Sequence, residues 1–255
     1  MIQFRMKKSE KLEIIYQDEY FIAINKPSSL LVHRSPIDRH ETRFAIQMLR
    51  DQIGQWVYPV HRLDKPTSGV LLFALDKESA KIISAQFREH TIKKAYISVV
   101  RGYTDASGII NHPLKEKLDK IADKDASREK EAQDAISEYE TLASVEIDFA
   151  VGRYNKTRYS LVKVKPKTGR KHQIRRHLKH ISHHILGDTK YGRGEHNKFI
   201  REEFDCHRLL LHAISLEFKH PYTYEIIRID ATLDETFNSI LCSFFPQHTT
   251  QNSLL

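Results

Sequence analysis

Cysteine is scarce in this chain, which carries two, Cys206 and Cys242, in 255 residues. Their positions match neither a paired nor a metal-binding spacing, so we expect no structural disulfide and a reducing compartment. The chain also lacks a run of about 20 apolar residues, the length that a helix needs to cross a bilayer. The opening segment MIQFRMKKSEKLEII lacks the apolar core of a signal peptide. We therefore predict a cytoplasmic protein with no membrane partner.

Positive charge, in contrast, is in excess. The chain has 41 Lys and Arg residues against 33 Asp and Glu residues, a net charge of +8. The cations crowd the stretch between Lys163 and Lys190, which contains a single acid, Asp188. Such a concentration indicates a phosphate-rich partner such as a nucleic acid. Charge alone fits a solvated basic face equally well.

The spacing of apolar residues predicts more strands than helices. Residues 12–16 and 20–26 have strand patterns separated by a polar turn and closed by Pro27, which is typical of a hairpin. The wholly apolar run VLLFAL, residues 70–75, predicts a buried strand, and Asp76 directly after it is a candidate helix cap. Further strands are expected at 95–100, at 136–145, at 159–164 and within 209–233, and further helices at 42–53 and from about Lys171. Because hairpins outnumber βαβ units, we predict an α+β fold with a largely antiparallel sheet.

The pattern divides the chain into a flexible tail at 1–11, one folded domain at 12–245 and a frayed C-terminal tail at 246–255. The stretch 115–135 is dense in charges of both signs and poor in large apolar residues, so we expect a surface excursion there. No unusual apolar surface stripe is left over, which favours a monomer.

The segment HRLDKPTSGVLL, residues 61–72, is a polar loop that runs straight into the predicted buried strand. This arrangement places a side chain at the end of a sheet. Asp64 lies between Arg62 and Lys65, and cationic neighbours favour the charged form of a carboxyl group. A carboxylate suits nucleophilic or basic work. On spacing alone, an aspartate that caps a turn is the more common explanation.

A second polar segment, KPKTGRKHQIRRHL, covers residues 165–178. Its turn and the following helix would present backbone N–H groups together with cations, which favours phosphate binding. Arg175 follows Ile174 and so lies about 100° around the helix from that buried position. Arg175 can therefore sit at the edge of the core and reach a partly buried carboxylate. A generic basic helix fits this pattern equally well.

Five segments together resemble the RluA-type pseudouridine synthases, in the order of that family's motifs and over roughly residues 12–221. They are YQDEYFIAINKPSSLLVH, HRLDKPTSGVLLFAL, QFREHTIKKAYISVVRG, PKTGRKHQIRRHL and RLLLHAISLEFKHP. The resemblance implies the pseudouridine synthase fold, in which helices and loops flank a mixed, largely antiparallel sheet with a central catalytic cleft. It also implies an isomerase that converts uridine in RNA to pseudouridine without a cofactor or metal.

The resemblance assigns roles to particular residues. Asp64 falls on the catalytic aspartate, Tyr96 on the active-site tyrosine, and Arg175 on the arginine that pairs with the aspartate. Arg62 is expected to hold the flipped-out nucleotide or to fill the gap that it leaves in the stack, and Ile174 and Leu211 are expected in the pocket wall or core. The remaining predicted RNA-binding residues are basic side chains near these motifs: Lys65, Lys94, Lys167, Arg170, Lys171, His172 and Arg176.

The family resemblance also predicts the kind of RNA. The first motif begins at Leu12, which leaves no place for the N-terminal S4-type domain of many ribosomal RNA enzymes. The stretches VHRS, LDKIADKDA and GRYNKTRYSLV are similar to the branch that modifies uridine 65 of tRNA. We therefore expect tRNA as the partner, with its target uridine flipped out. Large-subunit ribosomal RNA and a non-catalytic RNA-binding protein are the alternatives.

Several histidines between residues 172 and 184 invite comparison with a metal site. They lack the cysteine or acidic companions of a common zinc site, and two of them are adjacent. We predict no metal. The cluster consists of His172, His177, His180, His183 and His184.

Overall fold

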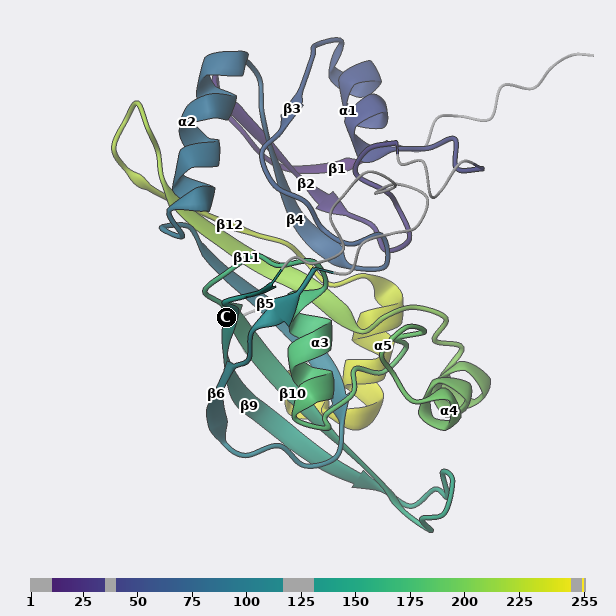
Figure 1. The fold of residues 1–255 in the computed structure, drawn as a ribbon. Helices are drawn as coiled ribbons and strands as arrows, with labels where there is room; N and C mark the ends of the chain where they lie inside the picture. The colour runs from purple at the N-terminus through teal and green to yellow at the C-terminus, as the bar shows by residue number, and fades with distance from the viewer. Residues whose placement is uncertain (1–10, 35–39, 117–130, 249–253, 255) are drawn as a thin grey trace, which may run out of the picture.

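The computed structural model describes residues 11–34, 40–116, 131–248 and 254 (Figure 1). The strands are β1 Glu13–Gln17, β2 Phe21–Lys26, β3 Tyr58–Pro59, β4 Ser68–Ala74, β5 Lys93–Arg101, β6 Ser107–Asn111, β7 Leu114–Lys115, β8 Ala132–Gln133, β9 Ile136–Ile147, β10 Thr157–Pro166, β11 Leu211–Lys219 and β12 Ile226–Asp230. The helices are α1 Ala45–Ile53, α2 Lys77–Arg88, α3 Gln173–His180, α4 Gly194–Phe204 and α5 Glu235–Phe244, followed by a 3-10 turn at Pro246–His248.

Ten strands form one sheet in the order β1-β2-β4-β11-β5-β10-β9-β6, with β3 added to β4 and β12 added to β11. β4 and β11 pair in parallel, and the other strand pairs of the described sheet are antiparallel. β7 and β8 form a separate two-stranded ribbon. The predicted α+β class with a largely antiparallel sheet is confirmed.

The half of the sheet that contains β2 and β4 is covered on both faces. Leu71 and Phe73 of β4 pack in the cluster that includes α1, whereas Val70 and Leu72 pack in the cluster that includes α2. This burial explains why the β4 sequence is apolar at every position rather than alternating. Asp76 caps α2 as predicted, since its Oδ1 accepts the Ser79 N–H at 2.8 Å.

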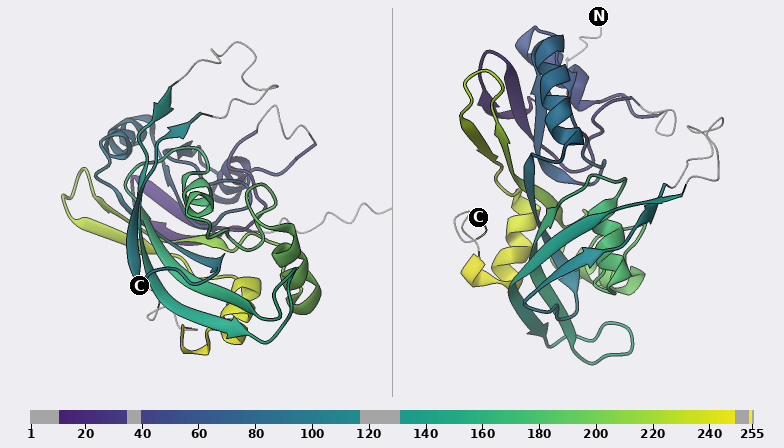
Figure 2. Two further views of the ribbon diagram at one scale, coloured as in Figure 1. Left: turned by 60° about the horizontal axis from the view of Figure 1, so that its bottom comes forward. Right: turned by 60° about the vertical axis from the view of Figure 1, so that its left-hand side comes forward.

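The other half of the sheet lies between α3 and α5 (Figure 2). Alternate residues of β5 point to opposite faces, so Ile97 and Val99 pack in the α5 cluster and Val100 packs in the α3 cluster. α3 begins two residues after the predicted start and buries Ile174 and Leu178 as expected. α4 and α5 were not predicted, because no strong apolar stripe distinguishes α4 and the segment of α5 is short and close to the polar end of the chain.

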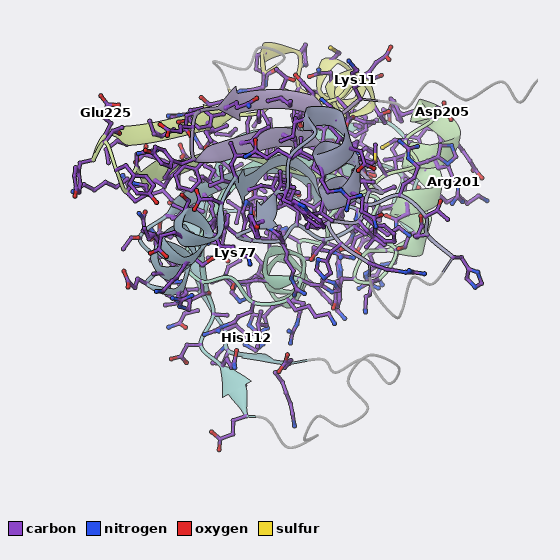
Figure 3. All side chains as sticks on the ribbon, turned by 90° about the horizontal axis from the view of Figure 1, so that it is seen from above. Lys11, Lys77, His112, Arg201, Asp205 and Glu225 are labelled. Atoms are coloured by element: carbon purple, nitrogen blue, oxygen red, sulfur yellow. The ribbon has the colours of Figure 1, made fainter. Side chains whose placement is uncertain are left out.

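The predicted C-terminal tail at 246–255 differs from the structure. Pro246–His248 form a 3-10 turn, and the side chain of Leu254 is 2% exposed in the α5 cluster, where burial of its apolar surface fixes it. The predicted N-terminal tail, apart from Lys11, and residues 117–130 of the predicted excursion lie outside the described residues. The strands that flank this segment, β7 and β8, project from the same face as α3, with His112 at their base (Figure 3). Within the described part of the chain, no helix is long and apolar enough to cross a membrane.

Gly69 lies where the two halves of the sheet meet. It pairs with Ala213 in the short parallel ladder between β4 and β11. Its φ is +110°, and a Cβ atom there would lie 2.2 Å from the Ala213 carbonyl oxygen. Residue 69 must therefore be glycine for β4 to approach β11, which brings the loop before β4 next to the second half of the sheet.

We predict that Gly69→Ala lowers the free energy of unfolding by more than about 3 kcal/mol, because strain and overlap with β11 add. Gly54→Ala is the matched control, since Gly54 also has a positive φ, of +69°, but a Cβ atom added to it would meet nothing within 4 Å. The control should lose only about 1 kcal/mol. Urea denaturation measures both, and equal losses would contradict the role of Gly69.

Candidate active site

The loop before β4 is held in place by β2 and the residues that follow β2. The buried Lys26 Nζ donates to the Lys65 carbonyl oxygen at 3.2 Å, and Ser28 Oγ donates to the Pro66 carbonyl oxygen at 2.9 Å. Lys26 Nζ also donates to the carbonyl oxygens of Pro27 and Leu30, both at 2.8 Å. Burial lowers the pKa of Lys26 to about 7. The backbone around Asp64 is therefore fixed from one side.

Asp64 itself starts a tight turn, in which the Thr67 N–H donates to the Asp64 carbonyl oxygen at 3.0 Å. At the start of the loop, His61 Nε2 accepts the Leu72 N–H at 3.0 Å. The Asp64 side chain stays 26% exposed at the surface of a cleft. The polar loop sequence thus serves to present one carboxylate at the end of β4.

The turn before α3 is tied to β9 through Gln173. Its Oε1 accepts the Arg170 N–H at 3.0 Å and the Thr168 hydroxyl at 2.7 Å. Its Nε2 donates to the Ile136 carbonyl oxygen at 2.9 Å. Gln173 therefore sets the direction in which α3 leaves the turn, and with it the position of Arg175.

Arg175 contacts two carboxylates. Its Nε and Nη2 each lie 2.8 Å from one oxygen of Asp188, and its Nη1 lies 3.2 Å from Asp64 Oδ2. The Arg175 side chain is 5% exposed and that of Asp188 is 1% exposed. Two parallel hydrogen bonds to Asp188 fix the guanidinium plane, and its remaining edge then points at Asp64.

Asp188 has further partners of its own. Its Oδ1 accepts the N–H groups of Lys190 and Tyr191, both at 2.9 Å. Burial opposes the charged form, but the hydrogen bonds and charge of Arg175, together with these N–H groups, outweigh it and hold the pKa of Asp188 below its ordinary value. Asp188 therefore stays charged and holds Arg175 in place through these hydrogen bonds.

His172 lies on the other side of the Asp64 carboxylate, with Nε2 3.8 Å from Asp64 Oδ1. Its Nδ1 is 2.9 Å from the Tyr191 hydroxyl. Burial lowers the pKa of His172 to about 4, although the Asp64 charge acts in the opposite direction. His172 is therefore neutral near pH 7, and Arg175 supplies the fixed positive charge beside Asp64.

A cleft of about 100 Å³ surrounds the Asp64 carboxylate. The structure brings eight of the predicted site residues together in its lining: Arg62, Asp64, Tyr96, Arg170, His172, Ile174, Arg175 and Leu211. Burial and the Asp64 charge raise the pKa of Tyr96 above its ordinary value. The Tyr96 phenol therefore keeps its proton at neutral pH and faces the cleft as a hydrogen-bond donor.

Five predicted RNA-binding residues are not in this lining. Lys65 pairs with Glu41 at 2.9 Å, and Lys167 pairs with Glu138 at 2.7 Å. The others are Lys94, Lys171 and Arg176, which lie elsewhere on β5, in the turn before α3 and on α3. Their contacts with RNA stay predictions.

The sequence reasoning missed Asp188, Tyr191 and Lys26. The sequence pattern around Asp188 and Tyr191 indicates only turns, although Asp188 is the one acid in the cationic stretch from Lys163 to Lys190. A lone acid among many cations is a usable signal, because several candidate partners for an ion pair lie near it in the sequence. Lys26 carries no comparable signal, since nothing in the strand sequence shows that the lysine at its end is buried.

The predicted histidine cluster does not converge on one point. His177 Nδ1 lies 2.9 Å from Ser137 Oγ, and His183 Nδ1 lies 2.9 Å from the Arg101 carbonyl oxygen. His180 stacks on His112 with ring centroids 3.7 Å apart. In the described ranges, no group of three or more His, Cys, Asp or Glu residues is placed to hold a metal ion.

A model of the RNA pseudouridylate synthase family matches residues 20–180. The chain belongs to the RNA pseudouridylate synthase family. Its RluA-type character, expected from the five motifs, is confirmed.

Two curated relatives of the family are similar over nearly their whole length. The tRNA pseudouridine synthase C of Vibrio parahaemolyticus is 55% identical over 234 residues, which are 92% of this chain and 95% of that protein. The tRNA pseudouridine synthase C of Haemophilus ducreyi is 53% identical over 92% of this chain and 96% of that protein.

Solved structures of the family share the fold. Human RNA Pseudouridylate Synthase Domain Containing 4 superposes with a TM-score of 0.66 at 26% identity, over 90% of this chain and 91% of that one. Human RNA Pseudouridylate Synthase Domain Containing 1 has the same fold, with a TM-score of 0.69 at 24% identity over 93% of this chain and 89% of that one.

We predict that Asp188→Asn lowers the free energy of unfolding by about 3–5 kcal/mol, because it leaves the buried Arg175 charge poorly paired. Glu138→Gln is the matched control, since it removes a carboxylate that pairs with Lys167 at 40% and 53% exposure. The control should lose less than about 1 kcal/mol. Equal, small losses in urea denaturation would contradict the account of Asp188.

The same pair gives a pH dependence with a defined sign. The pKa of Asp188 is lower in the folded protein than in the unfolded chain, so its contribution to stability is complete above about pH 4 and is lost as the pH falls below it. The Asn variant should lack this part of the acid-induced loss.

Proposed function

We propose that this protein isomerises a uridine of tRNA to pseudouridine, that its target is uridine 65, and that residues 12–245 form the catalytic unit. The tRNA substrate is supported by the identity of 53–55% to relatives named tRNA pseudouridine synthase C. The observation that carries the proposed chemistry is the Asp64 carboxylate, which Arg175 holds at 3.2 Å in a small cleft. The cytoplasmic location and the monomeric state stay predictions.

The reaction rearranges one nucleotide without a net loss of atoms. The C1′–N1 bond breaks, the uracil turns, a C1′–C5 bond forms, and the proton on C5 is released while N1 gains one. Two routes use a carboxylate here: attack on C1′, or removal of the 2′ proton to give a glycal. Asp64 supplies that carboxylate in both routes.

Hydrolysis of the glycosidic bond is a poorer fit to the cleft. Ordinary glycoside hydrolysis uses two carboxyl groups that flank the scissile bond. The second carboxylate of this site, Asp188, is 1% exposed and occupied by Arg175 and two backbone N–H groups. Among the described residues of the cleft, Asp64 therefore acts without a second carboxylate, which suits a detached uracil that is kept and rejoined.

Tyr96 and the apolar side chains of Ile174 and Leu211 supply the wall against which we place the uracil ring. An aromatic face stacks well on a base. Because burial and the Asp64 charge raise the pKa of Tyr96, its hydroxyl keeps its proton in the free protein. Proton removal from C5 by Tyr96 would first require the loss of that proton.

The target bond is inaccessible in a base-paired stem, so the nucleotide must flip out to reach the cleft. We propose that Arg62, exposed at the cleft, and Arg170 in its lining contact the everted nucleotide and its neighbouring phosphates. We propose that Lys171 and Arg176 extend this contact. Phosphate contacts of this kind make binding weaken as salt rises.

We predict that Asp64→Asn lowers tritium release from [5-³H]uridine tRNA at least 10³-fold, since the amide can neither attack C1′ nor accept the 2′ proton. Asp51→Asn is the matched control, because Asp51 is a 67% exposed carboxylate on α1 that pairs with Arg50. The control should keep the wild-type rate. Mapping the modified position in the product tests uridine 65.

The other outcomes separate the alternatives. Full activity in Asp64→Asn would remove the proposed mechanism. Tritium release from large-subunit ribosomal RNA but not from tRNA would show that ribosomal RNA is the substrate. Salt-sensitive RNA binding without release from either RNA would leave a non-catalytic RNA-binding protein.

A further inference from the structure

A second hollow, much larger than the active-site cleft, lies at the far end of α3. It has a volume of about 830 Å³, against about 100 Å³ for the cleft. Its walls come from the end of β5, the segment after α3 and the hairpin of β9 and β10, which extends below α3 in Figure 1. The proposed chemistry at Asp64 makes no use of it.

Cations outnumber carboxylates around this hollow. An adjoining hollow of about 420 Å³ shares Arg101, Tyr154 and His196 with it. The two together are lined by five cations and two carboxylates: Arg101, Arg153, Lys156, Arg158 and Arg193 against Glu146 and Glu195. Glu146 pairs with both Arg158, at 2.8 Å, and Lys156, at 3.3 Å, so it cannot neutralise them fully.

Arg101 is fixed in place by a neutral partner. Its Nε donates to His196 Nε2 at 3.0 Å, and His196 Nδ1 lies 2.9 Å from the hydroxyl of the buried Tyr159. Burial, reinforced by the Arg101 charge, lowers the pKa of His196 to about 4. His196 is therefore uncharged near pH 7, and the Arg101 charge remains available to a ligand.

Two exposed aromatic rings flank the cations. Tyr103 is 47% exposed and Tyr154 is 48% exposed. The Arg158 guanidinium lies 5.1 Å from the centroid of the Tyr103 ring, and the Arg153 guanidinium lies 5.0 Å from that of Tyr154. Cations beside exposed aromatic rings suit RNA, because its phosphates can bind the cations and its bases or riboses can pack on the rings.

We propose that this hollow is a second RNA contact, which holds a part of the tRNA away from the target nucleotide. The inference rests on the proposed function. α3 connects the two sites, because Arg175 lies at the cleft and His183, just past the helix end, lines the hollow. At a rise of 1.5 Å per residue, the five residues from Arg175 to the helix end at His180 span about 7.5 Å, and His183 follows three residues later. One RNA molecule can therefore bridge both sites.

A second copy of this chain is a poorer occupant. The chain has a net charge of +8, so another copy would bring like charge to a cationic hollow. The polyanionic backbone of RNA is complementary to it.

Substitutions can lower or raise the positive charge of the hollow, and the two kinds of variant should have opposite effects on tRNA affinity. We expect the double variant Lys156→Ala and Arg158→Ala to weaken tRNA binding about three- to tenfold. Its slope of log Kd against log salt concentration should be shallower by about 1–2, because up to two phosphate contacts are lost. Glu146→Gln should tighten binding, because it leaves both cations free for phosphate. A merely structural role of Glu146 predicts no gain in affinity.

Matched controls exist on the hairpin of β11 and β12, whose tip at Glu225 lies far from the β9–β10 hairpin (Figures 1 and 3). Lys219→Ala with Arg228→Ala removes two cations, one of which stacks on an exposed tyrosine, Tyr224, at 5.4 Å. Glu217→Gln removes a carboxylate that pairs with Lys93 and is 28% exposed, close to the 31% of Glu146. Both controls should bind tRNA as the wild type does.

The experiment measures tRNA affinity by filter binding and tritium release in parallel. Hollow variants that bind like their controls, or a Glu146→Gln variant that binds more weakly, would overturn the inference even if the wild type is active. The expected affinities with no tritium release from the wild type would instead overturn the proposed reaction alone. A dimer in sedimentation that the double variant dissociates, with unchanged tRNA affinity, would assign the hollow to a second copy.

Discussion

The guanidinium of Arg175 is shared between a carboxylate that water cannot reach and one that faces the cleft. Asp188 accepts two of its N–H groups and is itself held by the backbone after α3. The third donor, Nη1, therefore has a fixed direction. That donor holds Asp64 from 3.2 Å. The rest of the site follows from this pair, because the neutral His172 adds no compensating charge and the Tyr96 phenol keeps its proton. Among the described residues that line the cleft, Asp64 is therefore the one carboxylate, and Arg175 is the cation held against it.

The sheet makes this meeting possible. Asp64 and Arg175 are 111 residues apart in the chain; Asp64 precedes β4 in one half of the sheet, and Arg175 lies on α3, which packs on the other half. They meet because β4 and β11 run parallel for two residue pairs, where Gly69 lets the strands approach. Lys26 and Ser28 then hold the Asp64 loop, while Gln173 sets the direction of α3. The motifs that are separated in sequence thus bring two side chains, Asp64 and Arg175, together where the two halves of the sheet meet.

Much of this could be predicted from the sequence. Turn signals and apolar runs located the first hairpin, the buried β4 and α3, and the spacing of Ile174 and Arg175 on a helix placed the arginine at the core edge. The family motifs singled out Asp64 and Tyr96. Asp188 and Lys26 were not found, because a pattern does not show which polar side chain is buried. α5 was missed because its apolar segment is short and close to the end of the chain, and Leu254 was missed because the polar composition of residues 246–255 predicts a frayed tail.

The geometry of the site depends on the fork of the Arg175 guanidinium and not on its charge alone. An ammonium keeps the charge but cannot bind Asp188 through two parallel bonds while it also holds Asp64. The most direct measurement is the single-turnover rate of Arg175→Lys on saturating tRNA, with its fold checked by circular dichroism. We expect a rate at least about 100-fold below wild type with little change in tRNA affinity. A folded Arg175→Lys variant that retains the wild-type rate would contradict the account.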